Sequence, residues 1–346
     1  MKKRIVGIDL FCGAGGLTCG LKKAGIDILL GIDKEDYSKT YEKNNSGSQF
    51  WKTGIENVHG KDILSKISLK KSDKFLLAAC APCQPFSLQN KNRNSKRTSD
   101  GRKNLLLEVI RIMTEMERKP DYIFAENVPG IDENPVFVQF QDFLHSLYYS
   151  VMTKVVNAAD YGTPQNRKRL ILIASKEGFL EFPKKTHGES LQPHLTVKKA
   201  FKGLPPLKAG GQSAKYPNHF ARNLSPLNLT RIKLIPKDGG SRESLPEKLV
   251  LECHKKVNVH KDVYGRMFWR KPSPTLTTRC CSITNGRFGH PTQDRAISIR
   301  EAARLQGFPD SYIFYGSGID SQAKQVGNAV PVPLAKVFGK YFLQLN

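Results

Sequence analysis

The chain has 346 residues, 39% of them hydrophobic, and a formal net charge of +24, so we expect a globular protein with a basic surface and room for two domains. No apolar stretch approaches the roughly 18 residues of a membrane span, and Asp9 interrupts the apolar run that a signal peptide needs, so we expect neither a membrane-embedded nor an exported protein. Seven cysteines at irregular spacing do not form a disulfide framework, which favours a reducing compartment and free thiols.

Residues 1–175 alternate short runs of apolar residues with helical patterns, which is typical of a doubly wound α/β sheet. The predicted strands cover residues 4–11, 27–33, 74–80, 121–127 and 169–175. Between the third and the fourth, an apolar stripe that includes Leu106, Ile110 and Met113 predicts a helix that ends at Lys119-Pro120.

A glycine-rich turn follows the first predicted strand and precedes a helix. Gly13, Gly15 and Gly16 supply backbone N–H groups where a helix N-terminus can meet a negatively charged ligand group. Counting from Gly13, the sixth position is Thr18 and not the glycine of a dinucleotide fingerprint, which favours a nucleoside ligand that bears a carboxylate. Asp33, at the end of the next strand, stands where ribose hydroxyls are commonly bound. A glycine turn without a ligand is the alternative.

Cys80 and Cys83 form a C-x-x-C pair after the strand at 74–80. The chain has no second such pair, and the three later cysteines lack zinc-ribbon spacing, so a metal or dithiol role is disfavoured. Cys80 ends an apolar strand, and we expect it in the core. Cys83 lies between Pro82 and Pro85 in a turn, and we expect its thiol to be held rigidly and exposed.

Charged residues stand at the ends of the two strands that follow. Glu126 ends an apolar strand at the edge where parallel sheets bind ligands, and in a desolvated pocket it could donate a proton. Arg167 and Arg169 stand two residues apart at the start of the last strand, so an extended backbone would point both to one face. A surface carboxylate and a solvated strand end are the alternatives.

From about residue 182 the composition changes to Pro, Gly, Asn and Lys, which predicts a second domain of irregular or β-rich structure. Residues 184–279 hold 20 Lys and Arg against 6 Asp and Glu, and residues 91–103 hold another basic cluster. Charge concentrated in this way suits a polyphosphate partner. After Pro333 the pattern is again helical and predicts a helix that returns to the first domain.

The motifs together resemble those of bacterial-type DNA cytosine-C5 methyltransferases. The matching segments are DLFCGAGG, GKDI, APCQPFS, ENVPG, NAADYGTPQNRKR, KPSPTLTT, REAARLQGFPDSY and QVGNAVPVPLA, and they follow the family's order from Asp9 to Ala335. The resemblance implies a Rossmann-like methyltransferase domain over residues 1–183. It further implies a target-recognition domain over residues 184–292, and a hinge with a returning helix over residues 293–346.

The resemblance also implies roles for single residues. Cys83 matches the nucleophile, Glu126 the acid, and Arg167 and Arg169 the paired arginines. The positions that match contacts to S-adenosylmethionine are Phe11, Gly13, Gly15, Asp33, Asp62, Pro82 and Asn328. The ribose acid is often Glu in this family, and here it is Asp33.

The chemistry of the family explains these residue types. A thiolate adds to C6 of a flipped-out cytosine, and the acid at N3 accepts the displaced charge, so that C5 can take a methyl group. Arg167 is expected to favour the thiolate and hold the base carbonyl. A basic loop after the nucleophile is expected to close over the DNA backbone as a lid. Its expected DNA contacts are Lys91, Arg93, Lys96, Arg97 and Arg102.

As partners, the resemblance implies duplex DNA and a companion restriction endonuclease for a cytoplasmic, monomeric enzyme. Three alternatives stay open on the sequence: an RNA (tRNA) cytosine-C5 methyltransferase with the same motifs, a catalytically silent DNA-binding relative, and a cysteine-based redox protein. Intact Cys83, Glu126, Arg167 and Arg169 disfavour the silent relative. The redox protein would require Cys80 to be as reactive as Cys83.

Overall fold

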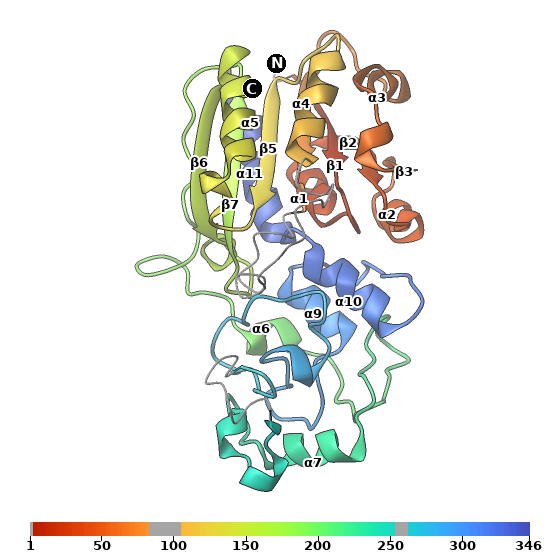
Figure 1. Cartoon of the computed structure of the whole chain (residues 1–346), viewed down its shortest axis with the longest axis vertical. Coiled ribbons are helices and arrows are strands. Elements are labelled where there is room, and N and C mark those ends of the chain that lie inside the picture. The colour runs from red at the N-terminus through yellow and green to blue at the C-terminus, as the bar shows by residue number, and fades with distance from the viewer. Residues whose placement is uncertain (1–2, 83–104, 253–261) are drawn as a thin grey trace. The chain divides into compact units, whose positions relative to one another are not determined.

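The computed structural model describes residues 3–82, 105–252 and 262–346, which form two compact units (Figure 1). Unit 1 consists of Met1–Asn157, Lys168–Lys185 and Val332–Asn346, and unit 2 of Ala158–Arg167 and Thr186–Pro331. The predicted bounds at residues 183 and 292 separate domains of different function, whereas the two units are defined by how compactly the chain packs. The predicted functional domains therefore stay a prediction.

Unit 1 is built on one seven-stranded sheet with the order β3-β2-β1-β4-β5-β7-β6 in the described residues. The strands are β1 (Ile5–Leu10), β2 (Asp27–Asp33), β3 (Gln49–Lys52), β4 (Lys74–Ala79), β5 (Tyr122–Asn127), β6 (Ser150–Asn157) and β7 (Lys168–Ser175). The pairs from β3 to β5 are parallel, and β7 runs antiparallel to both β5 and β6. This confirms the predicted Rossmann-like α/β class, in which the central strands are buried on both faces.

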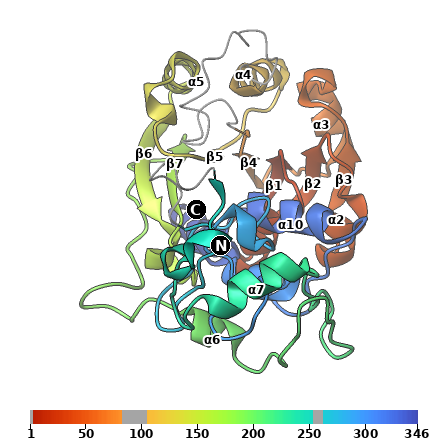
Figure 2. The same cartoon turned by 60° about the horizontal axis from the view of Figure 1, so that its bottom comes forward.

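Helices cover both faces of the sheet in unit 1. They are α1 (Gly16–Ala24), α2 (Ser38–Asn44), α3 (Gly60–Lys66), α4 (Leu105–Glu115), α5 (Pro135–Ser146) and α11 (Val332–Leu345). Figure 2 shows α3, α4 and α5 together on one side of the strands. Strand β5 shows the alternation: Ile123 belongs to the core shared with α4 and α5, whereas the Phe124 ring lies 5.4 Å from that of Phe338 in α11.

Helix α11 returns to unit 1 and packs against α1 at a site where only glycine fits. A Cβ on Gly20 would stand 2.4 Å from the Cβ of Ala335 and 2.6 Å from the carbonyl oxygen of Val332. Gly339 makes the reciprocal approach, since a Cβ there would lie 2.7 Å from that of Ala24. The two helix backbones therefore approach closely, which fixes α11 on the sheet.

Unit 2 is irregular rather than β-rich, because its described residues form isolated β-bridges and no named strand. Its helices are α6 (Val197–Phe201), α7 (Pro226–Leu234), α9 (Ile299–Leu305) and α10 (Ile319–Asn328). Irregular backbone leaves carbonyl groups without ladder partners, and buried arginines satisfy them. Arg266 is fully buried and donates to the carbonyl oxygens of Ile235 and His290. Among the described residues, no helix is long and apolar enough to cross a membrane.

Candidate active site

The carboxyl ends of β1, β2, β4 and β5 meet at one edge of the sheet, because these strands are parallel. Strand β7 is antiparallel, and its pairing of Leu170 with Asn127 brings the start of β7 to the same edge. The glycine turn, Asp33, Pro82, Glu126 and Arg169 each lie at these strand ends in unit 1. Open α/β sheets bind their ligands at this edge.

The glycine turn after β1 has a backbone that requires its glycines. Gly13 has φ of 53° and Gly15 of 86°, and Phe11 adopts the same left-handed region at 60° despite its side chain. The turn is fixed to β2 because the Cys12 N–H donates to the Ile32 carbonyl oxygen at 3.1 Å. No described residue lies within 4 Å of a Cβ placed on Gly13, so the described part of the chain leaves space beside the turn.

Asp33 holds this turn through its carboxylate. Its Oδ2 accepts the Gly13 N–H at 2.9 Å and its Oδ1 accepts the Glu35 N–H at 2.9 Å. Burial raises the pKa of Asp33, and the two backbone donors oppose that rise. The 20-residue spacing noted in the sequence therefore corresponds to a direct contact between Gly13 and Asp33.

Asp9 lies beneath the turn as a buried carboxyl group that the sequence analysis did not single out for function. Thr18 donates to its Oδ2 at 2.7 Å, and the Thr18 hydroxyl also lies 2.9 Å from that of Tyr41. Burial raises the pKa of Asp9 to about 7, and the Asp33 carboxylate contributes to that rise. An Asp in an otherwise apolar strand was the available signal.

Glu126 and Arg169 form an ion pair at the end of β5 and the start of β7. The Arg169 Nε lies 2.8 Å from Glu126 Oε1, and the two side chains are 14% and 11% exposed. Arg169 Nη1 also donates to the Lys168 carbonyl oxygen at 2.7 Å. The pair places an acidic group and a cation together at the edge of the sheet, where a polar base could contact both.

Arg167 has a different described partner. It directly precedes strand β7, which begins at Lys168, and its carbonyl oxygen accepts the Ala158 N–H at 2.9 Å. That the two arginines share one face stays a prediction. The Arg167 side chain is buried in unit 2, where Nη1 donates to the Leu276 carbonyl oxygen at 3.1 Å. The contact with Leu276 joins residues far apart in the sequence, which the alternating pattern could not reveal.

The cysteine pair is divided by the end of the described segment. Cys80 follows β4 directly, and burial, with a contribution from the Glu126 carboxylate, raises the pKa of its thiol well above the ordinary value. A protonated thiol is a poor nucleophile. The Cys80 side chain is partly exposed, so the expectation that it lies in the core is not met in full. Cys83 lies outside the described residues, as do Lys91, Arg93, Lys96, Arg97 and Arg102.

Asn127 is the residue of this region that sequence reasoning missed. It is buried, and its Nδ2 donates to the Ala81 carbonyl oxygen at 3.1 Å. This bond fixes the backbone two residues before Cys83 to the strand that carries Glu126. A hydrogen bond from a side chain to a carbonyl far away in the sequence leaves no spacing pattern. The position of Asn127 in the ENVPG motif was therefore the only sequence signal for this residue.

The remaining predicted cofactor positions are more exposed. Pro82 is exposed, and Asp62 is partly exposed in the first turn of α3. Asn328 ends α10 in unit 2 and is exposed. The preceding Gly327 lies so close to the backbone of Thr277 that a Cβ would meet its carbonyl oxygen at 2.1 Å, which fixes the end of α10. No group of three metal-ligating side chains occurs in the part of the chain that the structure describes.

Comparison with known proteins gives a match along nearly the whole chain. The family model described as C-5 cytosine-specific DNA methylase matches residues 5–344. The chain is 42% identical over 344 residues to Type II methylase M.HgiDII of Herpetosiphon aurantiacus, covering 96% of this chain and 93% of that protein. It is 33% identical to Type II methyltransferase M1.HphI of Haemophilus parahaemolyticus, covering 98% and 87%.

Solved structures share the fold. A crystal structure of a prophage-encoded DNA modification methyltransferase of Escherichia coli superimposes with a TM-score of 0.70 at 24% identity and covers 99% of both chains. The Dnmt2 methyltransferase of S. pombe superimposes with a TM-score of 0.66 at 18% identity, covering 99% of this chain and 98% of that one. At these identities the likeness concerns the fold.

Proposed function

Because the chain belongs to the C-5 cytosine-specific DNA methylase family, we propose that it transfers the methyl group of S-adenosylmethionine to C5 of a cytosine flipped out of duplex DNA. The observation that carries this proposal is the convergence at one sheet edge. There, the glycine turn bonded to Asp33, the strand that leads to Cys83, and the Glu126–Arg169 pair lie at adjacent strand ends.

The residues around the glycine turn fit S-adenosylmethionine. Each Asp33 oxygen already accepts one N–H, so one lone pair remains on each to accept a ribose hydroxyl. Helix α1 begins directly after the turn, and no described side chain caps its N-terminus, where a carboxylate could be bound. The Asp33 carboxylate, which accepts from the Gly13 and Glu35 N–H groups, lies beside the turn, where its charge would suit a sulfonium cation. When bound, this cofactor supplies an electrophilic methyl group. From the resemblance, Phe11, Gly13, Gly15, Asp62, Pro82 and Asn328 complete its contacts.

Cys83 is the proposed nucleophile. Its thiolate forms a bond to C6 of cytosine, the C5–C6 double-bond electrons become available at C5, and a proton or hydrogen bond from Glu126 neutralises N3. After C5 has gained its methyl group, loss of the C5 proton and cleavage of the sulfur–C6 bond restore the aromatic ring and the thiolate. Cys80 is the weaker candidate, because its raised pKa disfavours the thiolate.

Arg169 keeps the Glu126 carboxyl group at the edge of the sheet through the 2.8 Å ion pair and offers further N–H donors to the base carbonyl. Arg167 is assigned to the same chemistry by resemblance alone. Its described contact, with the Leu276 carbonyl oxygen, supports a structural role within unit 2.

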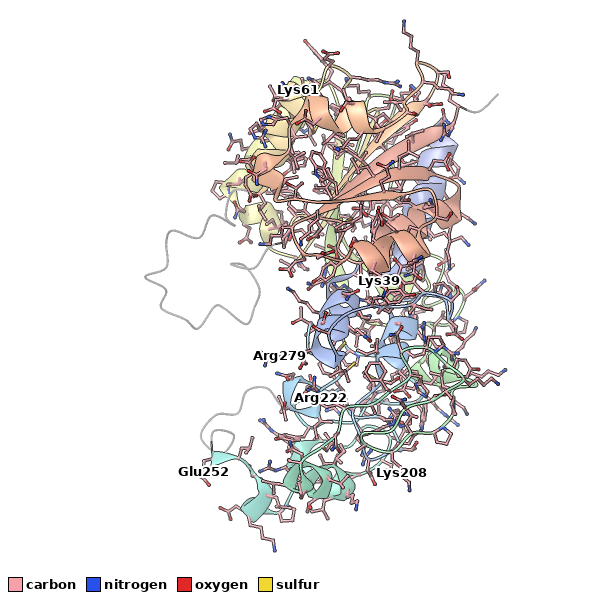
Figure 3. All side chains as sticks on the ribbon, turned by 90° about the vertical axis from the view of Figure 1, so that its right-hand side faces the viewer. Lys39, Lys61, Lys208, Arg222, Glu252 and Arg279 are labelled. Carbon is pink, nitrogen blue, oxygen red and sulfur yellow. The ribbon has the colours of Figure 1, made fainter. Side chains whose placement is uncertain are left out.

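Duplex DNA is the proposed partner of unit 2. Figure 3 shows Arg222 and Arg279 on one side of this unit, and Arg279 is exposed. Arg222 is anchored, since its Nε donates to the Cys281 carbonyl oxygen at 3.3 Å. Such cations can hold phosphates while other side chains read base edges. Because relatives carry the name Type II methylase, we also infer a companion restriction endonuclease and a monomeric enzyme of the bacterial cytoplasm.

A mechanism-based trap tests this function. DNA with 5-fluorocytosine in the target site, together with S-adenosylmethionine, should leave the protein covalently attached through denaturing electrophoresis, because fluorine at C5 cannot leave as a proton does. Cys83→Ser should abolish the adduct, and Cys80→Ser should retain it. Adduct formation in Cys83→Ser would refute the assignment of the nucleophile. Bisulfite sequencing of DNA from expressing cells would identify the site, and tRNA as the acceptor tests the RNA alternative.

A further inference from the structure

Unit 2 contains a pocket that the proposed methyl transfer does not use. Its volume is about 730 Å³, and its walls come from α6 and from the segment around Trp269. The side chains that matter here are Lys198, Lys199, Lys202, Phe201, Trp269 and Arg270. This volume lies within the range of about 300–1,000 Å³ that is usual for small-molecule and cofactor sites.

Backbone hydrogen bonds hold the two walls together. The Lys198 N–H donates to the Trp269 carbonyl oxygen at 2.9 Å, and the Trp269 N–H donates to Asp238 Oδ1 at 2.6 Å. At the other end of α6, the Arg304 guanidinium donates to the Lys202 carbonyl oxygen at 2.8 Å. The positions from which the lysines extend are therefore fixed.

The pocket is strongly positive. Among the residues that the structure describes, four cations line it, Lys198, Lys199, Lys202 and Arg270, against one carboxylate, that of Asp238. The three lysines and the arginine are exposed, and none of them forms an ion pair with a described residue. Asp238 already accepts from the Trp269 N–H, so most of the positive charge is not neutralised by the protein. Cations gathered without partners attract a polyanion.

An aromatic wall accompanies the charge. Trp269 is partly exposed, and its ring packs edge-on against Phe201 at 5.9 Å and against His290 at 5.2 Å. His290 is buried, and burial lowers its pKa to about 3, so the imidazole is neutral and acts as an aromatic support. The indole is thus held from behind while part of it faces the pocket.

We propose that this pocket binds a nucleotide, with phosphate oxygens on the lysines and Arg270 and the base against Trp269. Aromatic surface beside cations is the combination by which proteins bind unstacked nucleotides. A convex duplex with its bases stacked inside could reach the cations and not the indole. In Figure 3 the green ribbon of α6 lies on the right of unit 2, the side of Lys208, whereas Arg222 and Arg279 lie on the left. The site is therefore separate from the cations assigned to the target duplex.

The fluorescence of Trp269 tests the proposal directly. The chain has two tryptophans, so the full-length Trp51→Phe protein reports Trp269 alone. Short oligothymidylate, thymidine triphosphate, inorganic triphosphate and a cytosine-free A·T duplex are titrated in turn. We expect both nucleotide probes to quench Trp269, and the stronger of the two identifies the source as a free nucleotide or a single strand. Anisotropy of labelled oligothymidylate repeats the comparison with both tryptophans present.

The paired variant Lys198→Glu with Lys199→Glu should weaken nucleotide binding by about tenfold or more and duplex binding by less than about threefold. Lys233→Glu with Lys248→Glu makes the same charge change at exposed residues of unit 2 outside the pocket lining, and should leave nucleotide binding within about threefold. Three results would overturn the proposal: no quenching of Trp269, equal binding of inorganic triphosphate, or equal losses for single strand and duplex. None of these readouts requires methyl transfer, so they are independent of the proposed function.

Discussion

Asn127 is a single side chain that fixes the backbone of Ala81, two residues before the proposed nucleophile Cys83. Replacing it with Ala removes the donor to the Ala81 carbonyl oxygen, and a lost buried hydrogen bond costs about 1–3 kcal/mol. We expect Asn127→Ala to slow formation of the 5-fluorocytosine adduct by about tenfold or more, because Ala81, two residues before Cys83, is no longer bonded to the strand that carries Glu126. Calorimetric binding of S-adenosylmethionine should change by less than about twofold. An unchanged trapping rate, or loss of cofactor binding as well, would contradict this positioning role.

Asp33 is the residue on which cofactor binding should depend most directly. Asp33→Ala removes the acceptor proposed for the ribose and also releases the Gly13 N–H, so affinity for S-adenosylmethionine should fall by the equivalent of about 1–3 kcal/mol. Asp36→Ala is the matched control, since Asp36 is exposed three residues later and pairs with Lys52 at 3.2 Å. Isothermal titration calorimetry without DNA measures the affinity of both variants for S-adenosylmethionine, and only Asp33→Ala should show the loss. Equal affinities would remove Asp33 from the site.

Asp9 should make the stability of unit 1 depend on pH. Its folded-state pKa of about 7 lies above the ordinary value of 3.8, so the folded chain holds this proton more tightly than the unfolded chain. The free energy of unfolding therefore falls as pH rises between about 4 and 7, by at most about 1.4 kcal/mol per unit, and this contribution is constant above 7. Asp9→Asn removes the titrating group. Urea unfolding at pH 5 and pH 8 should show the variant gaining stability relative to the wild type by about 1 kcal/mol or more. If the difference in free energy of unfolding between the variant and the wild type is the same at both pH values, Asp9 does not titrate in this way.

At the scale of elements, the sequence predicts what burial dictates. The strand predicted at 27–33 coincides with β2, because the interior of a parallel strand within the sheet is a continuous apolar run. Strands β3 and β6 escaped prediction, since they form the two edges of the sheet and carry exposed residues such as Lys154. The candidate site follows the same division. Glu126 and Asp33 were found at strand ends, whereas the contacts of Asn127 and the burial of Arg167 depend on residues far away in sequence.

The contact of α1 with α11 gives a prediction at this scale. Gly20→Ala introduces a Cβ at 2.4 Å from that of Ala335, and overpacking of this kind costs about 1–3 kcal/mol. Ala335→Gly removes the facing Cβ and should cost about 1 kcal/mol through helix propensity. If the clash is the cause, the double variant should be more stable than the sum of the two single effects predicts, by urea unfolding. Additive losses would indicate that the Val332 carbonyl, 2.6 Å away, is the dominant obstacle.

At the scale of the whole molecule, the net charge of +24 overstates the surface available to a polyanion. Within residues 184–279, Arg231, Arg242 and Arg266 are buried and belong to the interior of unit 2. Arg266, for example, satisfies backbone carbonyls there. The composition therefore predicted a nucleic-acid partner without showing which cations would meet it. Only the exposed ones can release counterions from DNA.

This distinction can be measured as the salt dependence of duplex binding. If the exposed cations hold six or more phosphates, log affinity should fall against log salt with a slope of about −5 or steeper. Arg279→Ala removes an exposed cation of unit 2 and should make the slope shallower by about 1, because one fewer counterion is released. Lys61→Ala removes the same charge from an exposed residue of α3 in unit 1 and should leave the slope unchanged if that lysine does not contact the duplex. A slope near −1 would mean that the excess charge does not meet DNA, and equal effects of the two variants would mean that net charge alone governs affinity.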